Sequence, residues 1–127
     1  MRLSALALAA ALALPAPVAA EPFTTAELLA IDDHGDEVDR LFLVSYAAGL
    51  AQGVEMSHQV AAEAGMAFFC PKEKLSFGGE LVLDVLREQV AWYPQSAAME
   101  PRVVFFTGLM KRYPCEEQQL GELGRPR

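Results

Sequence analysis

The feature that most constrains the fold is a single pair of cysteines, because Cys70 and Cys115 are the only two in 127 residues. In an oxidising compartment a disulfide between them is the expected state, and two free thiols or a shared metal ion are the alternatives. The bond would remove unfolded-chain entropy worth roughly 4 kcal/mol, a large part of the stability of a small domain. The spacing is not Cys-x-x-Cys, so we predict a structural disulfide rather than a thiol-exchange site.

The N-terminus has the three parts of a cleavable secretory signal peptide. Arg2 gives a positive start, an apolar run follows over 3–14, and small residues end at Ala20. The apolar run is too short to cross about 30 Å of hydrocarbon, which takes roughly 20 residues. We therefore expect residues 1–20 to be removed after Ala20, and the rest of the chain to be exported without insertion into a membrane.

The charge of the chain disfavours some classes of partner. Ten Lys and Arg residues against 17 Asp and Glu residues give a formal net charge of −7. A negative surface repels phosphate backbones and anionic lipid, whereas it attracts a basic protein or a cation. We expect no nucleic acid and no membrane surface among the partners.

Hydrophobic spacing, together with capping residues, glycines and prolines at the ends of segments, predicts four helices. The expected helices lie at 24–35, 36–64, 77–93 and 99–113. The first begins with a capping box, in which Thr24 is the N-cap and Glu27 stands three residues later. No segment has a strand period and no repeat is found. The predicted fold is all-α, a small bundle of four to five helices over 21–115 stapled by one disulfide, with a polar and mobile tail at 116–127.

Two glycines fall in the interior of the longest predicted helix. Gly49 and Gly53 each cost up to about 1 kcal/mol relative to alanine in such a position. We expect either close packing of another helix against them or a break near Gly53.

The apolar residues at helical spacing are expected to form the core. The five methionines and seven phenylalanines are included, because a core of this size needs them. The core stripes of the three longer helices are predicted to be Val38, Leu41, Phe42, Met56 and Val60, then Val82, Val85, Leu86, Val90 and Tyr93, and finally Val103, Phe106, Met110 and Tyr113.

Groupings typical of catalysis are few. The chain has two histidines and no glycine-rich phosphate loop, and its serines have no convincing base and acid nearby in sequence. The acid-rich run 32–37 and the pair Glu55 and His58 offer oxygen and imidazole ligands, but each is more economically a solvated helix entrance or face. We predict no enzyme, no metal site and no cofactor.

The connection between the second and third predicted helices is a candidate binding loop. Phe69 and Pro71 flank Cys70, and the tip that follows carries Lys72, Glu73 and Lys74. Such a tip is more often a solvated loop. A loop held by a disulfide and a proline is also pre-organised for docking into a partner, so we assign these three residues as candidate partner-binding residues.

The order of four motifs resembles that of a known family. They are Tyr46-Ala47-Ala48-Gly49 followed by Gly53, Phe69-Cys70-Pro71, Tyr93-Pro94 at a helix end, and Tyr113-Pro114-Cys115 after the last helix. In this order and spacing, from about Leu28 to Cys115, the chain resembles the Rap/Tai family of type VI secretion amidase immunity proteins. It differs from the common pattern of that family in lacking an additional cysteine pair, expected near Asp32 and just before Tyr46.

The resemblance implies a function. It implies a periplasmic, mostly helical protein, often a homodimer, which binds a peptidoglycan amidase delivered by other cells and blocks its active-site groove. Two alternatives remain open. One is a periplasmic acid-stress chaperone of the HdeA kind, which is also small, helical, exported and held by one disulfide. The other is an envelope protein with the same domain and no immunity role.

Overall fold

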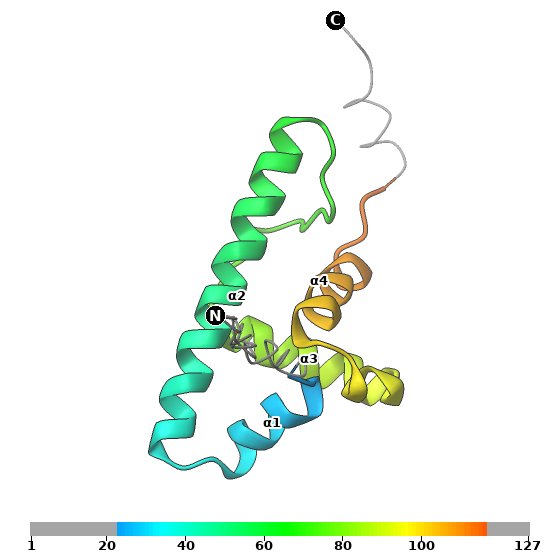
Figure 1. Ribbon diagram of the computed structural model, residues 1–127. Helices are drawn as coiled ribbons and strands as arrows, with labels where there is room; N and C mark the ends of the chain where they lie inside the picture. Colours follow the sequence, from blue (N-terminus) through cyan, green and yellow to red (C-terminus); the bar gives the residue numbers. More distant parts are fainter. Residues whose placement is uncertain (1–22, 117–127) are drawn as a thin grey trace, which may run out of the picture.

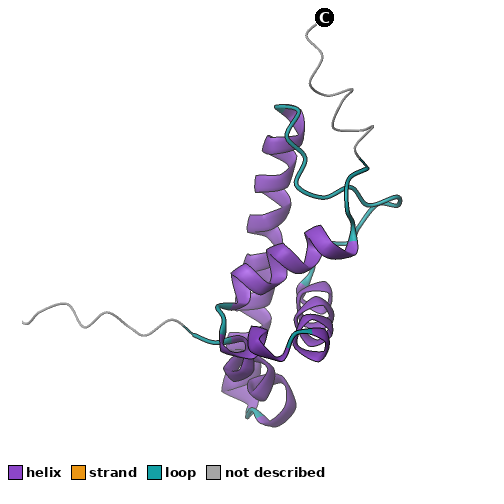
Figure 2. Cartoon of the chain, turned by 90° about the vertical axis from the view of Figure 1, so that its right-hand side faces the viewer, coloured by secondary structure: helices purple, strands orange, loops and turns teal. Residues whose placement is uncertain are grey.

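The protein is built from helices and loops. The computed structural model describes residues 23–116 and contains no strand in that part of the chain (Figures 1 and 2). Its elements are α1 (Thr25–His34), α2 (Glu37–Glu63), α3 (Gly79–Trp92), the 3₁₀-helix η1 (Pro94–Ala98) and α4 (Pro101–Arg112). The predicted all-α bundle of four to five helices is confirmed, and each predicted helix matches an observed one to within two residues at either end. The predicted signal peptide at 1–20 and, apart from Glu116, the tail at 116–127 lie outside the described residues.

Side-chain hydrogen bonds cap the N-termini of α1 and α2. At α1 the Thr24 hydroxyl accepts from the Glu27 N–H at 3.2 Å, and the Glu27 carboxylate accepts from the Thr24 N–H at 2.7 Å, as the capping box predicts. At α2 Asp36 accepts from the Asp39 N–H at 2.9 Å, and Asp39 accepts in return at 3.3 Å. Both boxes place acidic side chains at the positive end of a helix dipole.

The longest helix runs along one side of the molecule. α2 has 27 residues and is therefore about 40 Å long. α3 and α4 lie on the same side of it, and α1 folds back at its N-terminal end (Figure 1). No helix among the described residues combines the length and the apolar composition needed to cross a bilayer.

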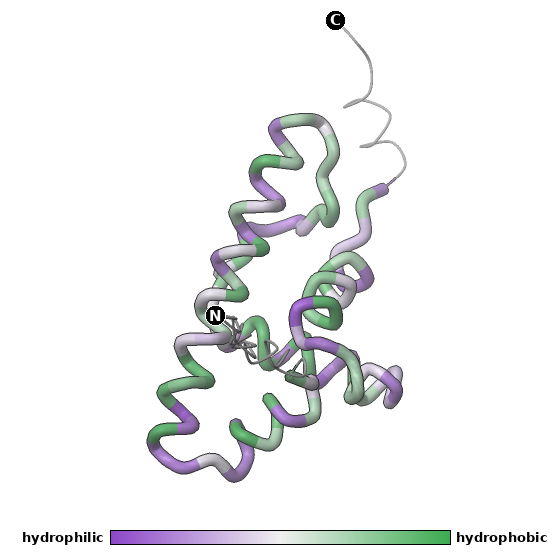
Figure 3. The backbone as a smooth tube through the Cα atoms, viewed as in Figure 1, coloured by the Kyte–Doolittle hydropathy of each residue, from purple (hydrophilic) through white to green (hydrophobic). Residues whose placement is uncertain are grey.

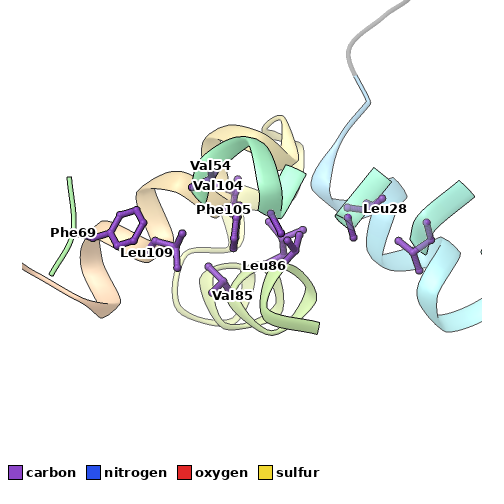
Figure 4. Close-up of a cluster of buried hydrophobic side chains, with 12 residues drawn as sticks. Leu28, Val54, Phe69, Val85, Leu86, Val104, Phe105 and Leu109 are labelled. Carbon is purple, nitrogen blue, oxygen red and sulfur yellow. The ribbon is translucent and has the colours of Figure 1, made fainter. Parts of the chain in front are cut away.

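α3 is the hub of the core. It packs against α1, α2, η1 and α4, and its Val82, Val85 and Leu86 are fully buried. The predicted core face of α3 is correct at these three positions, whereas Tyr93 is exposed. Side chains from α2, α4 and the loop after α2 converge on Val85 and Leu86 (Figure 4). These converging side chains are Val54, Phe69, Val104, Phe105 and Leu109.

The predicted disulfide is present. Cys70 and Cys115 are bonded, with their Cα atoms 4.8 Å apart and a separation of 45 positions in sequence. The bond joins the loop after α2 to the chain just after α4, two segments that pass beside each other in Figure 2. The Cys70 N–H also donates to the Tyr113 carbonyl at 2.8 Å. The loop after α2 and the C-terminal end of α4 are therefore tied together at one junction.

The predicted core face of α2 is wrong. The expected stripe is on the outside, where Val38, Met56 and Val60 are each at least 64% exposed and Leu41 and Phe42 are also exposed. The face that enters the core instead carries mostly small residues, namely Leu43, Ala47, Ala51, Val54 and Ala61. The small side chains allow α3 to approach closely, because a Cβ at Gly79 would lie 3.4 Å from that of Ala47.

The predicted core face of α4 is only partly correct. Phe106 and Tyr113 pack half-buried against the core, whereas Val103 and Met110 are exposed. The fully buried residues of α4 include Val104, Phe105 and Leu109, which the prediction left out.

The expectation that methionines form the core is wrong, because every methionine among the described residues is exposed. For the phenylalanines it is largely correct, since Phe69 and Phe105 are buried and Phe23, Phe77 and Phe106 pack half-buried against the core.

The two glycines of α2 are explained neither by a break nor by a packed helix of the described chain. α2 continues through Gly53 without interruption. Both Gly49 and Gly53 are exposed, and no atom lies within 4 Å of a Cβ placed on either. Within residues 23–116, therefore, neither a break nor a packed helix accounts for these two glycines.

A different glycine sets a close helix contact. A Cβ on Gly108 of α4 would lie 2.4 Å from Val85 Cγ1 and 2.9 Å from Gln89 Cγ, both on α3. These distances are well below van der Waals contact, so only glycine allows α4 to lie this close to α3.

Gly108→Ala should therefore destabilise the protein by about 1–3 kcal/mol, because overpacking outweighs the gain in helix propensity. Gly53→Ala is the matched control. Nothing lies near its Cβ, so it should stabilise the fold by up to about 1 kcal/mol. Urea unfolding at one low protein concentration compares the two. A Gly108→Ala variant as stable as the control would contradict the close contact.

Candidate functional site

The loop between α2 and α3 is anchored at its base. The chain reverses at Gly65, which has a φ of 79°, and runs without helix as far as Gly78. Phe69 is 1% exposed and stacks on His58 of α2, with ring centroids 3.9 Å apart. Together with the disulfide at Cys70 and the bond to the Tyr113 carbonyl, this ring fixes where the loop leaves the core.

The predicted partner-binding residues are at the exposed tip of this loop. Lys72, Glu73 and Lys74 are all exposed. They border a surface hollow of about 570 Å³ that also includes Arg112 and Pro114, from the other side of the disulfide. The tip is therefore a solvent-facing element mounted on a rigid base.

The walls of this hollow are held by charged contacts between α3 and α4. Arg112 donates to the Glu88 carboxylate through both Nε, at 3.2 Å, and Nη2. The hydrogen bond to Glu88 raises the pKa of Arg112, which stays charged. Lys111 lies over the Tyr93 ring, 3.8 Å from its centroid. These contacts hold the C-terminal end of α4 in place beside the loop.

His58 is a titratable group at the base of the loop. Burial lowers its pKa below the ordinary value of 6.5. Its Nδ1 is buried and has no hydrogen-bond partner among the described residues. The neutral ring therefore fits this position better than the charged one.

The pKa of His58 is lower in the folded protein than in the unfolded chain. The free energy of unfolding should therefore fall as the pH drops below about 6.5. The loss should build up between 6.5 and the lower pKa of the folded protein. His58→Phe keeps an aromatic ring against Phe69 and removes the titration. Urea unfolding of both proteins at pH 7.5 and 5.5 measures the difference. A variant with the same pH dependence as the parent in this range would exclude His58 as the cause.

The acidic residues considered as metal ligands are engaged elsewhere. Arg87 of α3 donates to both Asp32 and Asp33 at the end of α1, to Asp33 at 2.7 Å. The hydrogen bond from Arg87 lowers the pKa of Asp33. Glu55 accepts from the Gln59 side chain, and His58 faces Phe69. Within residues 23–116 no three His, Cys, Asp or Glu side chains gather in a way that could hold a metal ion.

A second candidate surface was missed by the sequence analysis, which assigned it to the core. Apolar residues recur along the whole length of α2, not only where it meets α3 (Figure 3). The apolar side chains of α2 that face away from the core are exposed to solvent. Beside them, between α2 and α4, lies an open groove of about 590 Å³ whose lining is almost entirely apolar. The groove includes Gly49 and Gly53 of α2, Phe68 of the loop, and Val103 and Phe106 of α4.

The signal for this surface is present in the sequence. α2 carries two apolar faces on opposite sides, and most of the large apolar side chains lie on the outer one. Helical periodicity shows that both faces exist but does not say which one meets the core.

Comparison of the chain with protein-family models, with characterised proteins and with solved structures gives no match. The function must therefore be inferred from two exposed surfaces of the molecule. One is an exposed charged loop on a rigid base, and the other is a long apolar helix face with an adjoining groove. Both are suited to contact with another protein.

Proposed function

We propose that this chain is a periplasmic immunity protein that binds a peptidoglycan-degrading amidase delivered by type VI secretion and blocks its active-site groove. The observation that carries the proposal is the loop at 70–76, pinned at its base and exposed at its tip. Inhibition by this route needs occupation of the groove and no chemistry by the inhibitor.

A loop that is already held in place has an energetic advantage in binding. Binding costs the entropy of ordering flexible segments, so a loop already held in place loses less when it docks. Here the disulfide at Cys70, the buried Phe69 and the hydrogen bond to Tyr113 restrict the base before any partner arrives. The tip residues keep their side chains free for the partner.

The motifs that carry the family resemblance support the same proposal. Two of them, Phe69-Cys70-Pro71 and Tyr113-Pro114-Cys115, meet at the disulfide that holds the loop. A third, Tyr93-Pro94, lies at the end of α3, where the Tyr93 ring contacts Lys111 of α4. Two of the four motifs therefore form the base of the proposed binding element.

One observation favours an acid-stress chaperone as the second candidate. Arg87 joins α3 to α1 through the carboxylates of Asp32 and Asp33, and protonation of Asp33 would remove one of these ion pairs. Because the pKa of Asp33 is lowered in the folded protein, its contribution to stability is complete above about 3.8 and is lost as the pH falls through the lower folded value. Loosening α1 would then expose apolar surface near pH 3.

The test uses the chain from Glu21 onward and cell-wall amidases encoded in type VI secretion clusters, with release of stem peptides from peptidoglycan as the readout. We expect stoichiometric inhibition of one such amidase at pH 7. Replacing Lys72, Glu73 and Lys74 together with alanine should raise the dissociation constant at least about 10-fold, because a tip that anchors the complex carries a large share of its energy. Thermal unfolding shows whether the variant keeps its fold.

Glu37→Ala/Arg40→Ala is the control, since both residues are exposed at the opposite end of α2 from the loop. It should inhibit like the parent. Unchanged affinity of the triple variant would contradict the loop as the binding element. No inhibition of any amidase, together with suppression of protein aggregation at pH 3, would replace the immunity proposal by the chaperone.

A further inference from the structure

The groove between α2 and α4 is an apolar site of about 590 Å³. One wall is formed by Gly49 and Gly53 of α2, and the other by Val103 and Phe106 of α4. Phe68, from the loop after α2, adds a third side, and its ring packs edge-on against Phe106 with centroids 5.1 Å apart. The groove is therefore large enough for several apolar side chains.

The glycine wall of the groove suits an occupant that has a backbone of its own. No described atom lies within 4 Å of a Cβ placed on Gly49 or on Gly53. Because neither residue has a side chain, another backbone can come close to α2 at this point. Both glycines belong to the first of the four sequence motifs, which the loop at 70–76 does not use. The groove therefore favours a peptide segment.

The C-terminal segment of the same chain starts beside the groove. The Sγ atom of Cys115 lies 3.9 Å from the carbonyl oxygen of Ala67, the residue before Phe68. Four polar residues at 116–119 then precede Leu120, and four residues span up to about 13 Å. Leu120 is thus within reach of the Phe68 side of the groove.

The segment beyond residue 119 has the composition that the groove requires. Its apolar side chains are Leu120 and Leu123, and each is followed by a glycine, at 121 and 124. Residues three apart lie on one side of a helical turn or of a polyproline II segment, so both leucines can enter the groove together. The glycines leave room for the segment to lie close to α2.

Charge complementarity favours the same segment. Arg102 is the one charged side chain among the described residues that line the groove. Its guanidinium donates to Glu100 through Nε, which leaves further N–H donors for a second carboxylate. Glu122 lies between the two leucines in sequence. A segment that places both leucines in the groove therefore brings a carboxylate to Arg102.

We propose that residues 120–123 of the same chain dock into the groove between α2 and α4, with both leucines in the groove and Glu122 beside Arg102. Attachment at Cys115 raises the local concentration of the segment to about millimolar, so a short apolar contact is sufficient. Docking covers an apolar surface that would otherwise stay open to solvent. It holds in place four residues for which composition alone predicts mobility, and it does not depend on the proposed amidase inhibition.

The first test measures backbone order by NMR relaxation in the isotope-labelled chain from Glu21 onward, at two protein concentrations. We expect order parameters of about 0.8 at 120–123, close to those of rigid backbone, at both concentrations. Leu120→Asp/Leu123→Asp should lower them below about 0.6, the range of flexible backbone. Gln118→Asp/Gln119→Asp is the matched control. It adds the same charge and keeps both leucines, so its order parameters should equal those of the parent.

A second test changes the groove instead of the segment. Val103 and Met110 both lie on α4 and are 40% and 41% exposed, but only Val103 lines the groove. Val103→Asp should release residues 120–123, whereas Met110→Asp should leave them docked. The dispersed amide signals of the core show that each variant is folded. Flexible values at 120–123 in the parent, values unchanged by the leucine substitutions, or order that appears only at the higher concentration would each overturn the proposal.

Discussion

The close packing of α3 against its neighbours is the contact on which the structure depends. α3 buries Val82, Val85 and Leu86 completely, and it does so because small residues face it on both sides. Ala47 lets α2 approach the N-terminal end of α3, and Gly108 lets α4 lie against Val85. Once α2 turns its small side chains toward α3, its large apolar side chains must lie on the opposite face. The exposed stripe is therefore a consequence of how the core is packed.

The disulfide completes this arrangement at the other end of the core. α2 extends beyond α3, and its C-terminal part is held by Phe69, which stacks on His58, and by the bond from Cys70 to Cys115. The same junction holds the base of the loop that carries Lys72, Glu73 and Lys74. The pinned loop and the outer face of α2 are thus two separate exposed surfaces.

The sequence predicted the elements well and their faces unevenly. Local signals mark the ends of helices, as the Thr24 and Glu27 box and the prolines at 94 and 101 do, and two cysteines allow one pairing. The face of α3 could be predicted because its charged residues lie opposite a single apolar face. α2 has two apolar faces, and the choice between them depends on how close α3 comes, which is a tertiary property. The tip at 72–74 is exposed as predicted, whereas the outer face of α2 was assigned to the core.

α2 faces the core with mostly small residues and leaves most of its large apolar side chains on the outside. The rate of methionine oxidation by dilute hydrogen peroxide, followed by peptide mass spectrometry, tests it most directly, because sulfoxide formation follows exposure. Met56 and Met66, which are 69% and 64% exposed, should oxidise at similar rates. A Met56 that oxidises several-fold more slowly than Met66 would contradict this orientation of α2.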